Sequence, residues 1–305
     1  MKISDIKPEV FDMAARVQSR LAARFAEIDA VAEMNTKRVM EAFQNHRVSD
    51  ACFAGTTGYG YDDLGREVLD RIYAEIFGAE AALVRINFVN GTHALTAAMF
   101  ALAKPGDKIL AVTGLPYDTL RNAIGISGDC HGSLKFYGVE YGQVDLTASG
   151  EPDYEAIAKA CEEENVSAVM IQRSRGYEER KALGVEEIGR ICNTVKSVNP
   201  KINVMVDNCY GEFTDTVEPT HVGVDIIAGS LIKNPGGGIA PTGGYIAGRQ
   251  ELVERAAMRL TTPGIGGECG STLGNNRLLF QGLFLAPHTV AQALKTACFC
   301  AGMIG

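Results

Sequence analysis

The chain has 305 residues, of which 46% are hydrophobic and 22% are charged, so it can bury one large core. Its formal net charge of −8 argues against a general nucleic-acid binder, whose binding surface would be basic. The eight cysteines form no C-x-x-C pair, which argues against a zinc ribbon and favours a reducing compartment. We find no secretory signal and no run of the roughly 20 apolar residues that a membrane helix needs, so we expect a cytoplasmic protein that does not bind membranes.

The N-terminal part of the chain predicts two helical regions around a glycine-rich loop. Residues 9–45 have apolar side chains every three or four positions after Pro8, which indicates a helix. The loop 52–65 ("CFAGTTGYGYDDLG") follows. The segment 66–78 ("REVLDRIYAEIFG") then predicts an amphipathic helix with Gly78 at its C-terminal cap.

From residue 81 onward, short apolar segments alternate with helical patterns. We expect seven strands, at Ala82–Ile86, Lys108–Val112, Ser133–Tyr137, Ala168–Gln172, Asn203–Val206, Ile226–Ala228 and Gly243–Ala247. We expect helices between them at Thr92–Ala103, Thr119–Ile126, Tyr154–Glu164 and Val185–Ser197. This alternation predicts an α/β domain whose mostly parallel sheet is buried on both faces. Ligands bind at the carboxyl ends of the strands in such sheets, so we searched for chemistry just after each strand.

Gly91 and Thr92 open a helix directly after an apolar stretch. Backbone N–H groups at a helix start bind phosphate or carboxylate groups, and a glycine lets the ligand approach the backbone closely. An ordinary N-terminal cap is the alternative interpretation. We find no Walker motif and no clean G-x-G-x-x-G pattern after a strand, which argues against a P-loop or Rossmann nucleotide-binding site.

Asp207 and Lys233 each follow an apolar strand. An unpaired carboxylate at the end of a buried strand is costly, so Asp207 needs a metal, an arginine or a protonated ring nitrogen, unless it caps a helix. Lys233, three residues after Ser230, is either a solvated loop residue or an amine held for Schiff-base chemistry. Together with the helix start at Gly91, these residues match the needs of pyridoxal 5′-phosphate for a phosphate cradle, an aspartate and a lysine.

The chain resembles the pyridoxal-phosphate superfamily with the aspartate aminotransferase fold (fold type I). Within it, the closest resemblance is to cystathionine and methionine gamma-lyases, in the branch often labelled aluminum resistance protein. The resemblance is most specific in "VNGTHALTAA", "GLPYDTL", "VDNCYGEF" and "GSLIKNPGGGIAPTGGYIAG". It implies an N-terminal helix and arm over 1–60 and a large cofactor-binding domain with a seven-stranded sheet over 61–285. Residues 286–305 would begin a linking helix, starting near Pro287, toward a C-terminal small domain that is largely absent from this chain.

The resemblance also implies roles for individual residues. Lys233 would form the Schiff base with the cofactor and then move the substrate Cα proton. Asp207 would keep the cofactor ring nitrogen protonated, and Tyr117 would stack on the ring and assist the leaving group. Five further residues would bind the cofactor, four at its phosphate and the last at its ring hydroxyl: Gly91, Thr92, His93, Ser230 and Gln172.

In the lyases, a tyrosine and an arginine of the neighbouring subunit complete the phosphate site, which implies a homodimer or homotetramer. Tyr59 fits the tyrosine, whereas Tyr61 stands where the arginine would be, and Arg66 could compensate. The arginine that binds the substrate carboxylate lies in the C-terminal domain of the family. Three arginines of this chain could substitute for it: Arg173, Arg175 and Arg277.

The resemblance implies a lyase that acts on a sulfur-containing amino acid by β- or γ-elimination. An aminotransferase or aldolase-type enzyme would use the same residues on the same fold, because the cofactor supplies the carbanion chemistry in each case. A non-catalytic homologue that only binds the cofactor is a further alternative. A nicotinamide oxidoreductase is disfavoured, because it would leave Asp207 and Lys233 unexplained.

Overall fold

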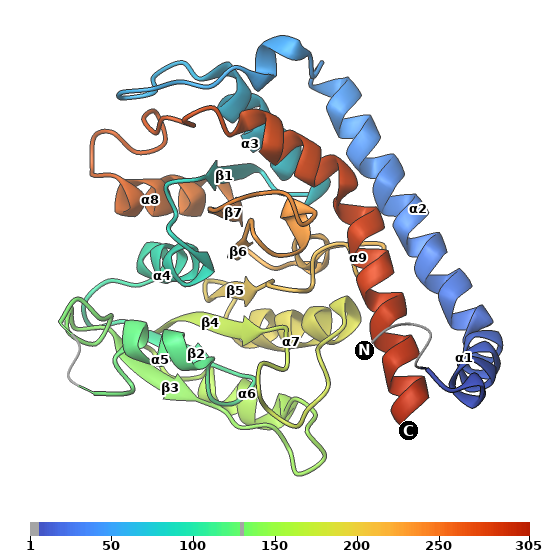
Figure 1. The fold of residues 1–305 in the computed structure, drawn as a ribbon. Coiled ribbons are helices and arrows are strands. Elements are labelled where there is room, and N and C mark those ends of the chain that lie inside the picture. The colour runs from blue at the N-terminus through green and yellow to red at the C-terminus, as the bar shows by residue number, and fades with distance from the viewer. Residues whose placement is uncertain (1–5, 129–130) are drawn as a thin grey trace.

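A computed structural model describes residues 6–128 and 131–305, which fold into an α/β domain around one sheet (Figure 1). The strands are β1 (Ala81–Arg85), β2 (Lys108–Ala111), β3 (Glu140–Gln143), β4 (Val166–Gln172), β5 (Asn203–Asp207), β6 (Ile226–Ser230) and β7 (Gly244–Gly248). Their order in the seven-stranded sheet is β1-β7-β6-β5-β4-β2-β3. Strand β7 runs antiparallel to both of its neighbours, β1 and β6, and the other neighbouring pairs are parallel. The predicted mostly parallel, seven-stranded sheet is therefore confirmed.

Helices cover both faces of the sheet. The helices are α1 (Pro8–Arg20), α2 (Ala22–Asn45), α3 (Leu64–Ile76), α4 (Gly91–Leu102), α5 (Asp118–Ile124), α6 (Tyr154–Ala160), α7 (Val185–Val198), α8 (Gln250–Leu260) and α9 (Asn276–Ile304). Side chains of helices α4, α5 and α8 pack on one face of the sheet, and side chains of α3, α6, α7 and α9 pack on the other. Alternate strand residues serve the two cores: Val204 and Val206 face one, whereas Met205 faces the other.

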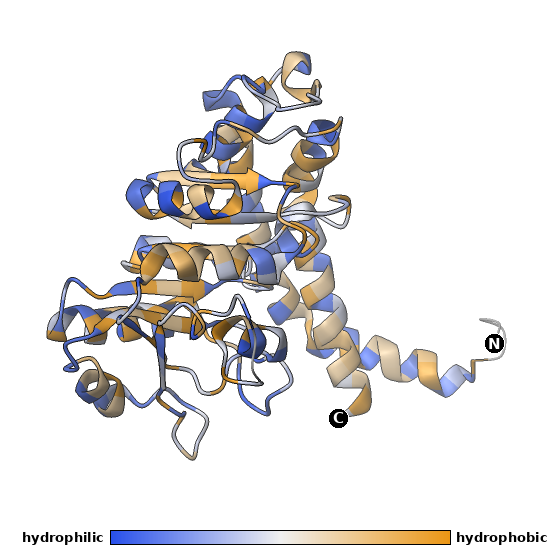
Figure 2. Cartoon of the chain, turned by 90° about the vertical axis from the view of Figure 1, so that its left-hand side faces the viewer, coloured by the Kyte–Doolittle hydropathy of each residue, from blue (hydrophilic) through white to orange (hydrophobic). Residues whose placement is uncertain are grey.

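The N-terminal helical region is divided into α1 and α2 at Leu21, where the backbone turns (φ −88°, ψ 0°). The apolar periodicity continues across this break, so the sequence predicted one helix instead of two. Helix α2 lies beside α9 along one side of the domain (Figure 1). Figure 2 shows that α1 projects away from the body of the domain and carries both hydrophilic and hydrophobic residues.

One strand prediction is wrong. The segment Ser133–Tyr137 forms turns that lead to Gly138, whose φ of 81° lies in the left-handed region. The strand of this part of the chain is β3, "EYGQ", which pairs only with β2 at the edge of the sheet. An edge strand need not be apolar on both faces, so β3 carries no apolar run that would reveal it.

The C-terminal helices also differ from expectation. Helix α9 begins at Asn276 and contains Pro287, whereas the sequence placed the start of this helix near that proline. The predicted helix Tyr154–Glu164 ends at Ala160, because residues 161–165 form turns before β4. Helix α8 was not predicted. Within residues 6–128 and 131–305, no helix is long and apolar enough to cross a membrane, and the location of the protein stays a prediction.

Candidate active site

A cavity of about 470 Å³ lies at the carboxyl ends of β5 and β6, beside the start of α4. It is the position at which α/β sheets bind ligands. Six of the predicted site residues line it: Gly91, Thr92, Tyr117, Asp207, Ser230 and Lys233. Residues from four separate segments of the chain therefore meet at one place, as the sequence predicted.

The start of α4 packs closely against the end of β6. Asn90 caps the helix, and its side chain accepts a hydrogen bond from the backbone N–H of His93 at 2.9 Å. A Cβ atom at Gly91 would lie 3.0 Å from the Cβ of Ser230, so glycine permits this close approach. The Ser230 hydroxyl is buried and has no hydrogen-bond partner among the described residues. A buried hydroxyl without a partner is costly unless a ligand satisfies it.

Asp207 ends β5, in register with Gln172 of β4, and only 5% of the residue is exposed. Burial raises the pKa of Asp207 to about 6, although the bond from the backbone N–H of Cys209 (3.1 Å) and the charge of Lys233 oppose this shift. Among residues 6–128 and 131–305, no arginine forms an ion pair with Asp207, and the buried Arg173 pairs with Asp215 and Glu218 instead. The carboxyl group is therefore available to a cationic partner in the cavity.

Lys233 follows β6 by a short turn, and its Nζ donates a hydrogen bond to the hydroxyl of Tyr210. The same Nζ lies 4.1 Å from the centroid of the Tyr210 ring. Tyr210 has a φ of 68°, which is uncommon for a residue other than glycine and aims this side chain at the lysine. The sequence analysis missed Tyr210, although its position three residues after Asp207 was a usable signal.

The glycines that follow Lys233 allow the turn that carries this lysine to pack closely against α9. A Cβ atom at Gly236 would lie 1.8 Å from the carbonyl oxygen of Leu231. One at Gly237, whose φ is 58°, would lie 2.2 Å from the carbonyl oxygen of Gly282. No side chain fits at either position. The glycine-rich stretch therefore serves close backbone packing next to the lysine.

Tyr117 directly precedes α5, and its backbone N–H donates to Oε1 of Gln172 at 2.7 Å. Nε2 of Gln172 donates to the carbonyl oxygen of Ser174 at 3.2 Å. Gln172 is not among the residues that line the cavity. This geometry gives Gln172 a role in holding Tyr117, which differs from the expected contact with a cofactor hydroxyl.

His93 and Tyr59 lie outside the cavity lining. The backbone N–H of His93 is already bound to Asn90, and its ring packs edge-on against Phe88 with centroids 5.4 Å apart. Tyr59 is 77% exposed, and its ring centroid lies 6.0 Å from that of Tyr61. An exposed Tyr59 is compatible with a contact to another subunit and not with one to the cavity of its own subunit.

The suggestion that Arg66 compensates at the phosphate site is wrong. Arg66 is 2% exposed, and its guanidinium group donates to the carbonyl oxygens of Gly60, Gly270 (2.8 Å) and Glu268 (2.9 Å). These bonds join the loop that carries Tyr59 to the segment before α9. The Arg66 guanidinium group therefore stabilises these two loops and does not point toward a phosphate site.

The three arginines suggested for the substrate carboxylate do not line the cavity. Arg173 is buried and bound to Asn208 (2.8 Å) and Asp215 (2.6 Å). Arg277 is exposed and binds Asp50 at 3.2 Å, and Arg175 lines a separate surface depression. None of them is positioned to replace a carboxylate-binding arginine.

A further buried carboxyl group, to which the sequence analysis assigned no role, lies five residues after Asp207. Glu212 is fully buried, and its Oε1 accepts a hydrogen bond from the Tyr245 hydroxyl at 2.8 Å. Burial raises the pKa of Glu212 to about 8. Its backbone carbonyl accepts from the side chain of Asn234 at 2.9 Å, so it links the Asp207 segment to the Lys233 turn.

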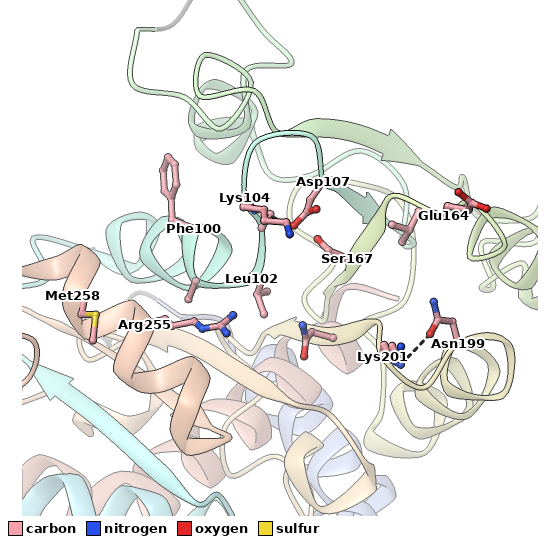
Figure 3. Close-up of a pocket in the computed structure, with 14 residues that line it drawn as sticks. Phe100, Leu102, Lys104, Asp107, Glu164, Ser167, Asn199, Lys201, Arg255 and Met258 are labelled. Atoms are coloured by element: carbon pink, nitrogen blue, oxygen red, sulfur yellow. Dashed lines mark hydrogen bonds between the residues drawn. The ribbon is translucent and has the colours of Figure 1, made fainter. Parts of the chain in front are cut away.

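A second cavity, of about 650 Å³, lies at the opposite, amino ends of β4 and β5 (Figure 3). Its charged lining residues are of both signs: Lys104, Lys201, Arg255, Asp107 and Glu164. The strands separate it from Lys233. We therefore assign it no part in the chemistry of the first cavity.

Comparisons with known proteins show the family to which the chain belongs. The family model for methionine gamma-lyase matches residues 10–305. The uncharacterized protein YnbB of Bacillus subtilis is 47% identical over 289 residues, which are 94% of this chain and 68% of YnbB. A crystal structure from Clostridium novyi, described as a carbon-sulfur lyase involved in aluminum resistance, is 50% identical and has a TM-score of 0.95. The match covers 98% of this chain and 71% of that one.

A more distant structure shows the fold alone. The pyridoxal-5′-phosphate-dependent protein YhfS of Escherichia coli has a TM-score of 0.65 at 18% identity, over 87% of this chain and 67% of that one. The fold is therefore that of the fold type I pyridoxal-phosphate enzymes, and the expected resemblance is confirmed. On the match over residues 10–305, the chain belongs to the methionine gamma-lyase family.

Proposed function

We propose that this protein is a pyridoxal-phosphate-dependent carbon–sulfur lyase that acts on a sulfur-containing amino acid by β- or γ-elimination. The observation that carries the proposal is the meeting of Lys233, Asp207 and the unpartnered Ser230 hydroxyl around one cavity. The Clostridium novyi structure, described as a carbon-sulfur lyase, supports the reaction class.

The cavity residues fit the cofactor group by group. The Ser230 hydroxyl and the backbone N–H groups at the start of α4, at Gly91 and Thr92, would bind the phosphate. The Asp207 carboxylate would pair with the protonated ring nitrogen, and the Lys233 amine would bind the aldehyde. When bound, pyridoxal 5′-phosphate supplies an electron sink for the negative charge that develops at the substrate Cα.

Different residues of the chain would then hold the charge on the ring nitrogen, accept the Cα proton and protonate the leaving group. With a pKa of about 6, Asp207 is mostly ionised at neutral pH and can hold a positive charge opposite it. The Lys233 amine would accept the Cα proton, while the Tyr210 hydroxyl holds Nζ in place. Tyr117, at the cavity wall, would donate a proton to the departing sulfur.

We also propose a homodimer or homotetramer in which Tyr59 reaches the phosphate site of a neighbouring subunit. Its 77% exposure and its position on a loop anchored by Arg66 support this role. Sedimentation of the purified protein, with and without a Tyr59→Ala substitution, tests it. We expect an oligomer in both cases and weaker cofactor binding in the variant. A monomer that binds the cofactor fully would contradict the shared site.

The products of the reaction test the lyase assignment. The protein, loaded with cofactor, is incubated with cystathionine-like and methionine-like substrates. We expect a keto acid, ammonia and a thiol in equal amounts. A keto acid without ammonia or thiol would indicate transamination, and a loaded protein with no product would indicate a non-catalytic homologue. Lys233→Ala should abolish product formation, whereas Lys201→Ala, in the second cavity, serves as the control.

A further inference from the structure

Gln172 joins two loops at the edge of the candidate active site. It ends β4, is 4% exposed, and uses both polar atoms of its side chain. Oε1 accepts from the backbone of Tyr117 at 2.7 Å, and Nε2 donates to the carbonyl oxygen of Ser174 at 3.2 Å. The segment that begins at Ser174 carries Tyr177. One buried amide therefore fixes both tyrosine-bearing segments against the end of the sheet.

The rings of the two tyrosines stack where these segments meet. Their centroids are 5.9 Å apart, the angle between the rings is 27°, and both residues line the cavity. This is an offset-stacked geometry that aromatic pairs prefer. Tyr177 covers one face of the Tyr117 ring, so only the other face can meet a planar group in the cavity.

The loop that carries Tyr177 is held by further contacts. Nη2 of Arg180 donates to the carbonyl oxygens of Gln172 (2.9 Å) and Ser174 (2.5 Å). Gly176 has a φ of 59°, and a Cβ atom there would lie 3.2 Å from Nε2 of Gln172. Glycine at this position lets the loop turn over the amide.

Tyr177 itself contributes little to the core, because 83% of the residue is exposed. Among residues 6–128 and 131–305, the aromatic ring that it contacts is that of Tyr117. A large aromatic side chain that is held in solvent against a site residue is better explained by the site than by fold stability.

We propose that Tyr177 is a positioning residue, which Gln172 and Arg180 hold in a stack against Tyr117 so that the Tyr117 ring presents a fixed plane to the cavity. The inference rests on the proposed function, in which Tyr117 faces the cofactor and the departing sulfur group. Tyr177 touches neither in this role and acts only through Tyr117.

The test compares Tyr177→Ala and Tyr177→Phe with the wild type. Tyr137→Ala is the matched control, because Tyr137 is also an exposed tyrosine that packs on another aromatic ring, that of Phe136, and does not line the cavity. The first readout needs no cofactor: the ¹⁹F resonance of Tyr117 in protein labelled with 3-fluorotyrosine, assigned through Tyr117→Phe. The second is the dissociation constant of pyridoxal 5′-phosphate from the 305-residue chain.

We expect Tyr177→Ala to move the Tyr117 resonance and to weaken cofactor binding by about three- to tenfold, since the stack is lost. Tyr177→Phe keeps the stacked ring and should bind within about twofold of the wild type. The Tyr137→Ala control should change neither readout. An unmoved Tyr117 resonance together with unchanged affinity in Tyr177→Ala would overturn the inference. A wild type that takes up no cofactor would refute the proposed function, and the ¹⁹F comparison would then decide the Tyr177 stack on its own.

Discussion

Replacing Ser230 by alanine should make the cofactor-free protein more stable and its cofactor binding weaker. Ser230 is 2% exposed, and its hydroxyl has no hydrogen-bond partner among the described residues. An unsatisfied buried polar group costs about 1–3 kcal/mol, so its removal should raise the free energy of unfolding by about 1 kcal/mol. A hydrogen bond to a charged group contributes about 1.5–3 kcal/mol, so loss of the phosphate contact should weaken cofactor binding by at least about tenfold.

Two measurements check both halves of this prediction. Urea unfolding of the cofactor-free protein gives the change in stability, and titration with pyridoxal 5′-phosphate gives the change in affinity. Ser133→Ala is the control, because the Ser133 hydroxyl is buried but accepts from the backbone N–H of Phe136 at 3.1 Å. That control should lose about 1 kcal/mol of stability and keep its cofactor affinity. A Ser230→Ala protein that is less stable and binds the cofactor normally would refute the reasoning.

Three further predictions follow from the same geometry. Because burial raises the pKa of Glu212 to about 8 from an ordinary value of 4.5, the folded state binds its proton more tightly, and the free energy of unfolding should fall as pH rises between these values. Glu212→Gln should flatten this fall in urea unfolding at pH 5 and pH 8, and an unchanged slope would contradict it. Gly237→Ala should cost at least about 2 kcal/mol in thermal unfolding, because the new Cβ would lie 2.2 Å from the carbonyl oxygen of Gly282; a smaller loss would mean that α9 can move. Asp207→Asn should keep the covalent link of the cofactor to Lys233 but lower turnover by about 100-fold, and near-normal kcat would remove Asp207 from the mechanism.

The residues that could be predicted from the sequence share one signal. Gly91, Asp207 and Lys233 each follow an apolar strand or stretch, so the rule that ligands bind at strand ends brought them together correctly. The polar edge strand Glu140–Gln143 lacked an apolar run and was missed for that reason.

Other features depend on contacts that no local pattern records. Tyr210 reaches Lys233 through a left-handed backbone conformation at a residue other than glycine. Arg66 binds the carbonyl oxygen of Gly270, and the two residues lie far apart in the chain. Tyr177 stacks on Tyr117 where the Gln172 side chain bonds to both loops. Such long-range contacts decide which charged and aromatic side chains are free to act.

The central claim is that Lys233 binds pyridoxal 5′-phosphate in the cavity beside Asp207 and Ser230. The most direct measurement is reduction of the purified, cofactor-loaded protein with borohydride, followed by mass spectrometry of its peptides. We predict a yellow protein whose absorbance above 400 nm disappears on reduction, with the pyridoxyl mass added at Lys233 and at no other lysine. A protein that stays colourless in excess cofactor, or an adduct on a different lysine, would contradict the account.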